Sequence, residues 1–239
     1  MFITLFYCLT FVAVKAHFAR ATPGQQIEIS KEQALLDYVF ENAEKGNAES
    51  VWKEMDNFSL ANPMLFVSDI KAIIIEEEIA EHKPKVIVEI GGDCGYSAVR
   101  FAHLQRQLVP DAKYVSFETC QQHADLVATI VSFAGLSNVV DIQVGTFTED
   151  FPRSSLGEVD MFITDHSKSR DLSDVKLIIE SGTLKKGSVI IGNNILCPNT
   201  SDYKGFMHDH TEFKSELMDT VAEYSVENKD AVMISKYIG

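Results

Sequence analysis

Hydrophobic and polar positions alternate along the chain in blocks that are typical of strands and helices in turn. Short apolar runs rich in β-branched residues predict strands near 85–90, 113–118, 139–144, 159–164 and 187–192, with a late strand at 231–237. Apolar positions at helical spacing predict helices between them, near 96–107, 121–134 and 171–181. This alternation favours an α/β fold with a parallel sheet and helices on both faces.

The stretch before the first predicted strand has a helical pattern. Ser30 and Gln33 occupy the outer positions of a capping box that opens a helix with Leu35 and Val39 on its apolar face. Further helices are expected around 48–55 and from about 67 to 80. We therefore expect a polar linker over residues 22–29 and a single domain over residues 30–239.

The first residues form a mostly apolar, uncharged run from Phe2 to Val14, which ends at Lys15. Small residues follow where a signal peptidase cuts, so we expect residues 1–21 to be a signal peptide. An uncleaved N-terminal anchor is the alternative, because the run is short for a spanning helix and lacks a basic leading region. Both place the protein in the secretory pathway or tethered to a membrane, whereas a misassigned start site would leave it cytoplasmic.

Composition limits the classes of partner. The net charge of −14 disfavours nucleic acid and anionic membrane surfaces, because phosphate binding depends on Lys and Arg. The four cysteines have no metal-type spacing, and removal of Cys8 with a leader would leave an odd number, which disfavours a disulfide framework. A monomer that binds a small molecule is expected.

A glycine-rich turn follows the first predicted strand. Gly91, Gly92 and Gly95 allow a tight turn close to a ligand, but their spacing does not match the fingerprint for a dinucleotide pyrophosphate. In a methyltransferase, the carboxylate of Glu89 and these glycines would hold the amino-acid part of S-adenosylmethionine. Glu118, at the end of the next strand, would bind the ribose hydroxyls. The alternative is a plain α/β turn with a solvated glutamate.

Polar residues also follow two later strands. Ligands of open α/β sheets bind at the carboxyl ends of the strands, where Asp165 and Lys168 share one turn and Asn193 and Asn194 another. Carboxylate and amide oxygens suit a hard cation such as Mg²⁺. In the alternative interpretation Asp165 caps the next turn and the asparagines only form a loop.

Several separate blocks give a resemblance to a known family. They are 42–50 (NAEKGNAES), 81–84 (EHKP), 94–100 (CGYSAVR), 132–135 (SFAG), 164–166 (TDH) and 194–198 (NILCP). In this order they resemble the catechol O-methyltransferases, which are class I, cation-dependent methyltransferases, from about Glu32 to the C-terminus. The resemblance implies a Rossmann-like seven-stranded sheet with an antiparallel last hairpin, and a role in catecholamine metabolism.

The resemblance also implies roles for individual residues. Cofactor contacts fall on Val67, Glu89, Gly91, Tyr96, Ser97, Glu118, Thr119, Thr146, Asp165 and His166. The residues that would bind Mg²⁺ are Asp165, Asn193 and Asn194. Those that would contact the acceptor are Lys168, Asn194, Pro198 and Glu223. Lys168 would be the general base. A phenol has a pKa near 10, so a cation and a nearby amine would both help to form an oxyanion.

Some positions depart from the family pattern. Asn193 replaces an aspartate, which leaves one protein carboxylate at the metal site. The other departures are Ser167 for a tryptophan, Pro63 and Leu65 for a tryptophan and a methionine, Phe147 for a serine, and Asp93 for an aromatic residue. They affect the expected strength of metal binding and the aromatic walls around the acceptor.

Three functions therefore remain open at the level of sequence. The first is Mg²⁺-assisted methyl transfer from S-adenosylmethionine to a hydroxyl of a catechol-like molecule. The second is a non-catalytic family member that binds cofactor or ligand with weak or no metal. The third is an altered enzyme that keeps the cofactor but uses a different acceptor or dispenses with metal. Lys168, Glu118 and Glu223 together favour the first, because a pure binding protein has no need of all three.

Overall fold

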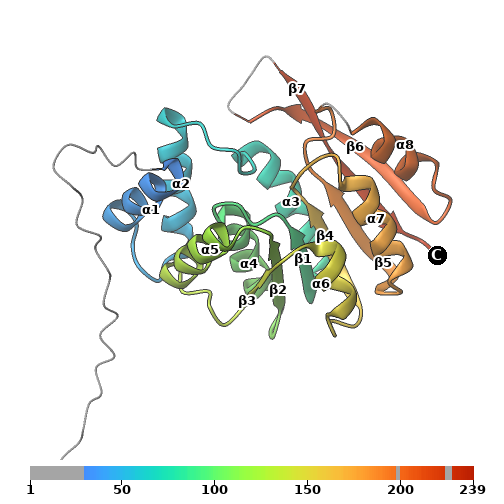
Figure 1. Ribbon diagram of the computed structural model, residues 1–239, viewed down its shortest axis with the longest axis horizontal. Helices are drawn as coiled ribbons and strands as arrows, with labels where there is room; N and C mark the ends of the chain where they lie inside the picture. The colour runs from blue at the N-terminus through green and yellow to red at the C-terminus, as the bar shows by residue number, and fades with distance from the viewer. Residues whose placement is uncertain (1–29, 198–199, 224–227) are drawn as a thin grey trace, which may run out of the picture.

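The computed structural model describes residues 30–197, 200–223 and 228–239, which form one sheet covered by helices on both faces (Figure 1). The strands are β1 (Val86–Ile90), β2 (Lys113–Glu118), β3 (Val140–Val144), β4 (Val159–Thr164), β5 (Leu184–Gly192), β6 (Phe213–Val221) and β7 (Lys229–Tyr237). The helices are α1 (Lys31–Asn42), α2 (Ala48–Ala61), α3 (Asp69–His82), α4 (Tyr96–Leu108), α5 (Gln121–Phe133), α6 (Phe147–Asp150), η1 (Phe151–Arg153), α7 (Asp171–Glu180) and α8 (Ser201–Asp209). The predicted α/β class and seven-stranded sheet are confirmed.

The strand order is β3-β2-β1-β4-β5-β7-β6. The first five strands are parallel, and β7 runs antiparallel to both β5 and β6. The chain moves outward from β1 through β2 to β3, and then returns to place β4 on the other side of β1. This reversal opens a crevice beyond the carboxyl ends of β1 and β4, where open α/β sheets bind ligands.

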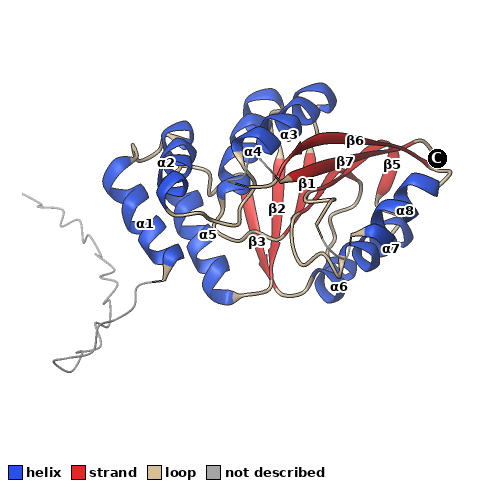
Figure 2. Cartoon of the chain, turned by 90° about the horizontal axis from the view of Figure 1, so that it is seen from above, coloured by secondary structure: helices blue, strands red, loops and turns tan. Residues whose placement is uncertain are grey.

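Alternate strand residues face two separate cores. Ile87 points into the core formed with α1 to α5, whereas the next residue, Val88, points into the core under α6, α7 and α8. Figure 2 shows the two groups of helices on either side of the sheet. Because successive side chains of a strand point to opposite faces, a strand buried on both faces must be apolar throughout, as β1 is apart from Glu89.

The amino ends of the strands are held together by Asp160 in β4. Its Oδ2 accepts hydrogen bonds from the backbone N–H groups of Lys85 (2.9 Å) and Val86 (2.8 Å), where β1 begins. Its Oδ1 lies 2.7 Å from Lys185 Nζ in β5. One carboxylate therefore connects three strands at the edge opposite the crevice.

The helices and strands predicted from β1 to α7 are present, most of them within three residues of the expected bounds. Ser30 caps α1 by accepting a hydrogen bond from Gln33 N–H (3.2 Å). Helix α2 continues to Ala61, six residues beyond the prediction, and helix α8 and strand β6 were not predicted from the residue pattern. The predicted leader and linker lie outside the described residues, and no helix of the described part is long and apolar enough to cross a membrane.

Candidate active site

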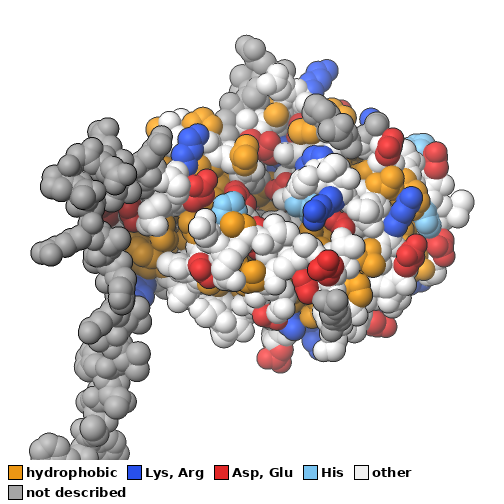
Figure 3. Space-filling model, viewed as in Figure 1, with side chains coloured by type: hydrophobic (Ala, Val, Ile, Leu, Met, Phe, Trp, Pro, Cys, Tyr) orange, Lys and Arg blue, Asp and Glu red, His pale blue; other side chains and the backbone are white. Residues whose placement is uncertain are grey.

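A cleft of about 770 Å³ opens at the carboxyl ends of the strands. In Figure 3, acidic, basic and histidine side chains are interspersed on the face that Figure 1 also shows. The predicted site residues that line the cleft are Gly91, Glu118, Thr119, Thr146, Asp165, His166, Lys168, Asn194 and Glu223. Five others, Val67, Glu89, Tyr96, Ser97 and Asn193, do not line it, and Pro198 lies outside the described residues.

The glycine turn after β1 packs against the turn after β4. Gly91 has a φ of 102°, and a Cβ there would collide with the carbonyl group of Asp165. Asp165 N–H donates to Ile90 O (3.0 Å), and Gly91 N–H donates to Phe117 O (2.9 Å). Only glycine combines this conformation with such close approach, so this residue allows the loops after β1 and β4 to meet.

Glu89 lies beneath the glycine turn and is fully buried. Its carboxylate accepts hydrogen bonds from Ser97 Oγ, in the first turn of α4, and from Ser116 Oγ (2.7 Å) in β2. Burial raises the pKa of Glu89 to about 7, since both hydroxyl donors offset only part of the desolvation. Val67 and Tyr96 are also buried, and the Tyr96 ring stacks on Phe66 at a centroid distance of 4.7 Å.

Glu118 closes β2 and lies in the wall of the cleft. Its Oε2 accepts from Asp93 N–H (3.1 Å), and its Oε1 accepts from Cys120 N–H (2.8 Å). The carboxylate therefore orients the loops after β1 and β2. Oε1 also accepts from Thr119 Oγ1 (3.4 Å), whereas Oε2 has a further lone pair, which leaves Glu118 able to accept a hydrogen bond from a ligand hydroxyl.

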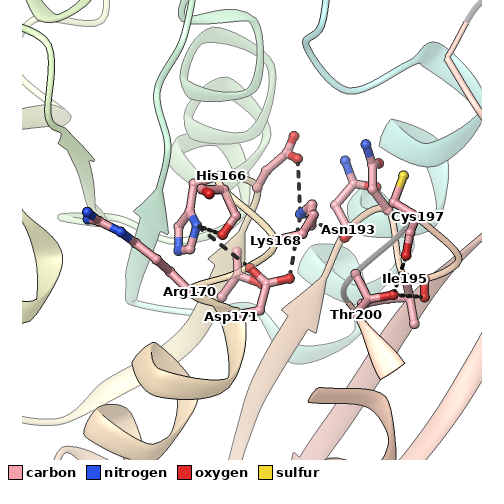
Figure 4. Close-up of polar contacts among 12 residues, drawn as sticks. His166, Lys168, Arg170, Asp171, Asn193, Ile195, Cys197 and Thr200 are labelled. Carbon is pink, nitrogen blue, oxygen red and sulfur yellow. Dashed lines mark hydrogen bonds and ion pairs between the residues drawn. The ribbon is translucent and has the colours of Figure 1, made fainter. Parts of the chain in front are cut away.

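Lys168 occupies the turn after β4, next to the loop after β5. Its ammonium group donates to Asn193 O (3.0 Å) and lies 3.8 Å from both Asp165 Oδ1 and Asp171 Oδ2. Figure 4 shows Lys168 between Asp171 and Asn193. His166, in the same turn, places Nε2 2.8 Å from Asp174 Oδ2. The turn thus presents an amine and an imidazole, each placed by carboxylates of α7.

Asp171 was not predicted as a site residue. It begins α7, is fully buried, and neither of its carboxylate oxygens has a hydrogen-bond partner among the described residues. Burial raises the pKa of Asp171 to about 6, an effect that the nearby charges of Lys168 and His166 oppose. The negative charge of Asp171 is therefore opposed by Lys168 and His166, both of which were predicted as site residues.

The predicted metal ligands provide only oxygen donors of the kind that Mg²⁺ prefers. Asn193 is buried, and neither polar atom of its amide has a hydrogen-bond partner in the described structure. Asp165 supplies a carboxylate, whereas Asn194 Oδ1 already accepts from Lys71 Nζ (2.5 Å). No group of three or more His, Cys, Asp or Glu side chains that could hold a metal occurs in the described residues. The donors fit a hard cation, with one formal negative charge among the three ligands.

Lys71 is a second residue that the sequence interpretation missed. Besides Asn194, its ammonium group contacts Glu223 Oε1 (2.5 Å) and Asp230 Oδ2 (2.6 Å). A signal was present in the sequence, because Lys71 is four and eight residues before the buried Ile75 and Ile79 and so lies on the same face of α3.

The substituted positions shape the rest of the cleft. Phe147, in place of the expected serine, packs edge-on against Phe117 at 5.3 Å and stacks on Phe151 at 4.5 Å. Leu65 lines the mouth of the cleft and is 87% exposed. The wall near Thr146 is therefore aromatic, and the mouth carries an aliphatic side chain.

Comparison with known proteins agrees with this geometry. Residues 88–195 match the family model described as a methyltransferase domain. Catechol O-methyltransferase of Bos taurus is 32% identical over 201 residues, which cover 82% of this chain and 73% of that protein. The chain belongs to the catechol O-methyltransferase family. It is an S-adenosylmethionine-dependent O-methyltransferase of class I.

Solved structures support the fold of this family. The O-methyltransferase from Bacillus cereus, in complex with SAH, superposes with a TM-score of 0.66 at 18% identity, over 88% of this chain and 93% of that one. An O-methyltransferase from Streptomyces achromogenes, in complex with SAM, gives 0.66 at 18% identity over 90% and 100% of the two chains. At this identity the likeness shows the Rossmann-like fold alone.

Proposed function

We infer that the protein transfers the methyl group of S-adenosylmethionine to one hydroxyl of a catechol-like small molecule, with Mg²⁺ bound weakly. The observation that carries this function is the convergence of Lys168, Asp165, Asn194 and Glu223 on one cleft whose wall also contains Glu118. An amine that can take a proton, oxygen ligands for a cation and an acid for ribose are the groups that such a transfer requires.

The cofactor is assigned to the side of the cleft formed by the loops after β1, β2 and β3. Glu118 accepts the ribose hydroxyls, and Thr119 and Thr146 line the same wall. Gly91 allows close approach of the backbone, and Glu89 lies beneath it as the counter-charge for the amino group. His166, placed by Asp174, lies beside the adenine. These residues hold the sulfonium methyl toward the turn that carries Lys168.

The acceptor is assigned to the side formed by Lys168, Asn194 and Glu223. Lys168 Nζ, after losing a proton to solvent, takes the proton of one hydroxyl as a neutral amine; that oxygen then forms the bond to the methyl carbon as the sulfonium C–S bond breaks, which leaves S-adenosylhomocysteine. Asp165, Asn193 and Asn194 would hold Mg²⁺, which supplies positive charge that favours an ionised hydroxyl. Glu223 accepts a hydrogen bond from the second hydroxyl. Fixing both hydroxyls makes the attack effectively unimolecular.

A second candidate has a specific observation in its favour. Asn193 is neutral, and the oxygen of Asn194 is already used by an ammonium group. These two facts favour an enzyme that keeps the cofactor and methylates an acceptor with little or no help from metal. The dependence of activity on Mg²⁺ separates this candidate from the first.

The test is methyl transfer by the full chain from methyl-labelled S-adenosylmethionine to catechol, with added Mg²⁺ or with EDTA. We expect transfer that increases with Mg²⁺ and falls about a hundredfold or more in Lys168→Met, while the surface variant Lys53→Met behaves as wild type. Activity that EDTA leaves unchanged supports the second candidate. A folded protein that binds the cofactor but methylates neither catechol nor other 1,2-diols would refute the first candidate, and one that also methylates no other phenol or alcohol would refute the second.

A further inference from the structure

The ammonium group of Lys71 lies where three distant segments meet. Lys71 belongs to α3, and its three oxygen partners are Asn194 after β5, Glu223 after β6 and Asp230 in β7. The three distances are 2.5, 2.5 and 2.6 Å. Lys71 is completely buried, which for a lysine requires paired charges around it.

The three partners of this ammonium group differ in their surroundings. Asp230 is buried, and its Oδ1 accepts hydrogen bonds from Leu196 N–H (2.9 Å) and Ala231 N–H (2.8 Å). Asn194 and Glu223 line the cleft instead. Asp230 is therefore the fixed anchor, and Lys71 connects this anchor to two side chains that face a ligand.

The contacts also determine how the two cleft side chains are turned. Because Asn194 Oδ1 faces the ammonium group, its amide nitrogen is directed to Glu223 Oε2, at 3.4 Å. Glu223 Oε1 accepts from Lys71, and Oε2, which accepts from Asn194, has one lone pair left for a hydroxyl donor. Without the ammonium group, Asn194 and Glu223 would lose the partner that fixes them. The carboxylates of Glu223 and Asp230 would also repel each other.

We propose that Lys71 is the positioning residue of the acceptor subsite, because its ammonium group fixes Asn194 and Glu223 in the orientation that receives two neighbouring hydroxyl groups. This inference rests on the proposed function and names the group that makes the subsite selective for a diol. A divalent cation held by Asn194 would compete with this ammonium group for the amide oxygen and would be repelled by its charge. Lys71 therefore favours the acceptor and weakens Mg²⁺ binding.

The opposite signs of these two effects provide the test. Calorimetry on the full chain saturated with SAH would measure binding of catechol at saturating Mg²⁺, and separately binding of Mg²⁺ alone. In Lys71→Met we expect catechol to bind at least tenfold more weakly and Mg²⁺ to bind more tightly, while the affinity for SAH changes less than twofold. Asp230→Asn keeps Lys71 but weakens its anchor, so it should also weaken the binding of catechol. Lys53→Met is the surface control.

Several results would overturn the inference. One is wild-type affinity for catechol in a folded Lys71→Met protein, or no catechol binding by the wild type. Another is a parallel loss of catechol, Mg²⁺ and SAH binding, which would indicate a structural role only. If Lys71→Met does not fold, unchanged catechol affinity in Asp230→Asn decides against it. Failure of the proposed function is separate, because it appears as wild-type protein that binds catechol without methylating it.

Discussion

Replacing Glu89 by glutamine should remove a pH dependence of cofactor binding. In the free protein the pKa of Glu89 is raised to about 7, mainly by burial; hydrogen bonds from Ser97 and Ser116 oppose this increase, and the charge of Asp165 adds to it. Tyr114, which also faces Glu89, has a pKa raised well above its usual value and stays neutral. Of these two groups, Glu89 is therefore the one whose charge changes near neutral pH. A bound cofactor ammonium group would favour the ionised form.

The size of the effect follows from this pKa. Between pH 6 and pH 8 the ionised fraction of a group with a pKa of about 7 rises from about one tenth to about nine tenths. If only the ionised carboxylate pairs with the ammonium group, the affinity for S-adenosylmethionine rises about tenfold over this range, which corresponds to about 1.4 kcal/mol. Binding near pH 6 releases a proton.

The same carboxyl group affects stability with a definite sign. Its ordinary pKa is 4.5, so from pH 4.5 to about 7 the unfolded chain loses a proton that the folded chain keeps. The free energy of unfolding of the free protein therefore decreases as the pH rises through this window, by at most about 3.4 kcal/mol. Glu89→Gln should make the unfolding free energy flatter over this window.

The assay is calorimetric titration with S-adenosylmethionine at pH 6, 7 and 8 in two buffers of different ionisation enthalpy. Glu89→Gln should bind with an affinity that varies less than about twofold over this range. Glu77→Gln, on the exposed side of α3, is the matched control and should keep the wild-type dependence. A wild-type affinity independent of pH, with no proton release, would refute the pairing of Glu89 with the cofactor.

Three further predictions concern the cleft. Glu118→Ala should weaken S-adenosylmethionine by about 1.5–3 kcal/mol in calorimetry, as for a hydrogen bond to a charged group; unchanged affinity would remove the ribose assignment, and Glu118→Gln controls for lost support of Cys120 N–H. Lys168→Met should lower kcat about a hundredfold or more with nearly unchanged cofactor affinity; full turnover would give the proton to another group. Asn193→Asp should raise Mg²⁺ affinity at least about tenfold, or 1.4 kcal/mol, in a titration of EDTA-treated protein; equal affinities would mean that residue 193 is not a ligand.

The central strands were predictable because burial on both faces leaves a continuous apolar run in the sequence. Strand β1 is such a run. Strand β6 is different, because within the described residues it lies at the edge of the sheet and pairs with β7 alone. Its residues Lys214, Glu216 and Asp219 interrupt the apolar pattern, and many of its positions are exposed or half-buried. An edge strand is determined by its partner more than by its own pattern.

Site residues that directly follow a strand were predictable for a similar reason, since topology alone brings the carboxyl ends of parallel strands together. Lys71 and Asp171 lie on helices instead. Lys71 is separated from Asp230 by 159 residues, so the sequence shows a buried lysine but not its partners. Asp171 begins a helix, where an acidic residue is common for reasons of the helix dipole alone. Their roles depend on tertiary contacts.

The two ends of the strands have different tasks. Asp160 holds the strands in register at their amino ends, and ligands bind at their carboxyl ends. Its bonds to the start of β1 and to Lys185 lie a full strand length away from Asn193 and Lys168. Substitutions in the loops at the ligand edge, such as Asn193, Ser167 and Leu65, leave those bonds untouched. A lineage could therefore exchange acceptors, or change its reliance on metal, one loop at a time while the scaffold keeps its strand alignment. For the engineer, the positions to randomise are those in the loops beyond β4 and β5 other than Asp165, Lys168 and Asn194, and Asp160 is the residue to leave unchanged.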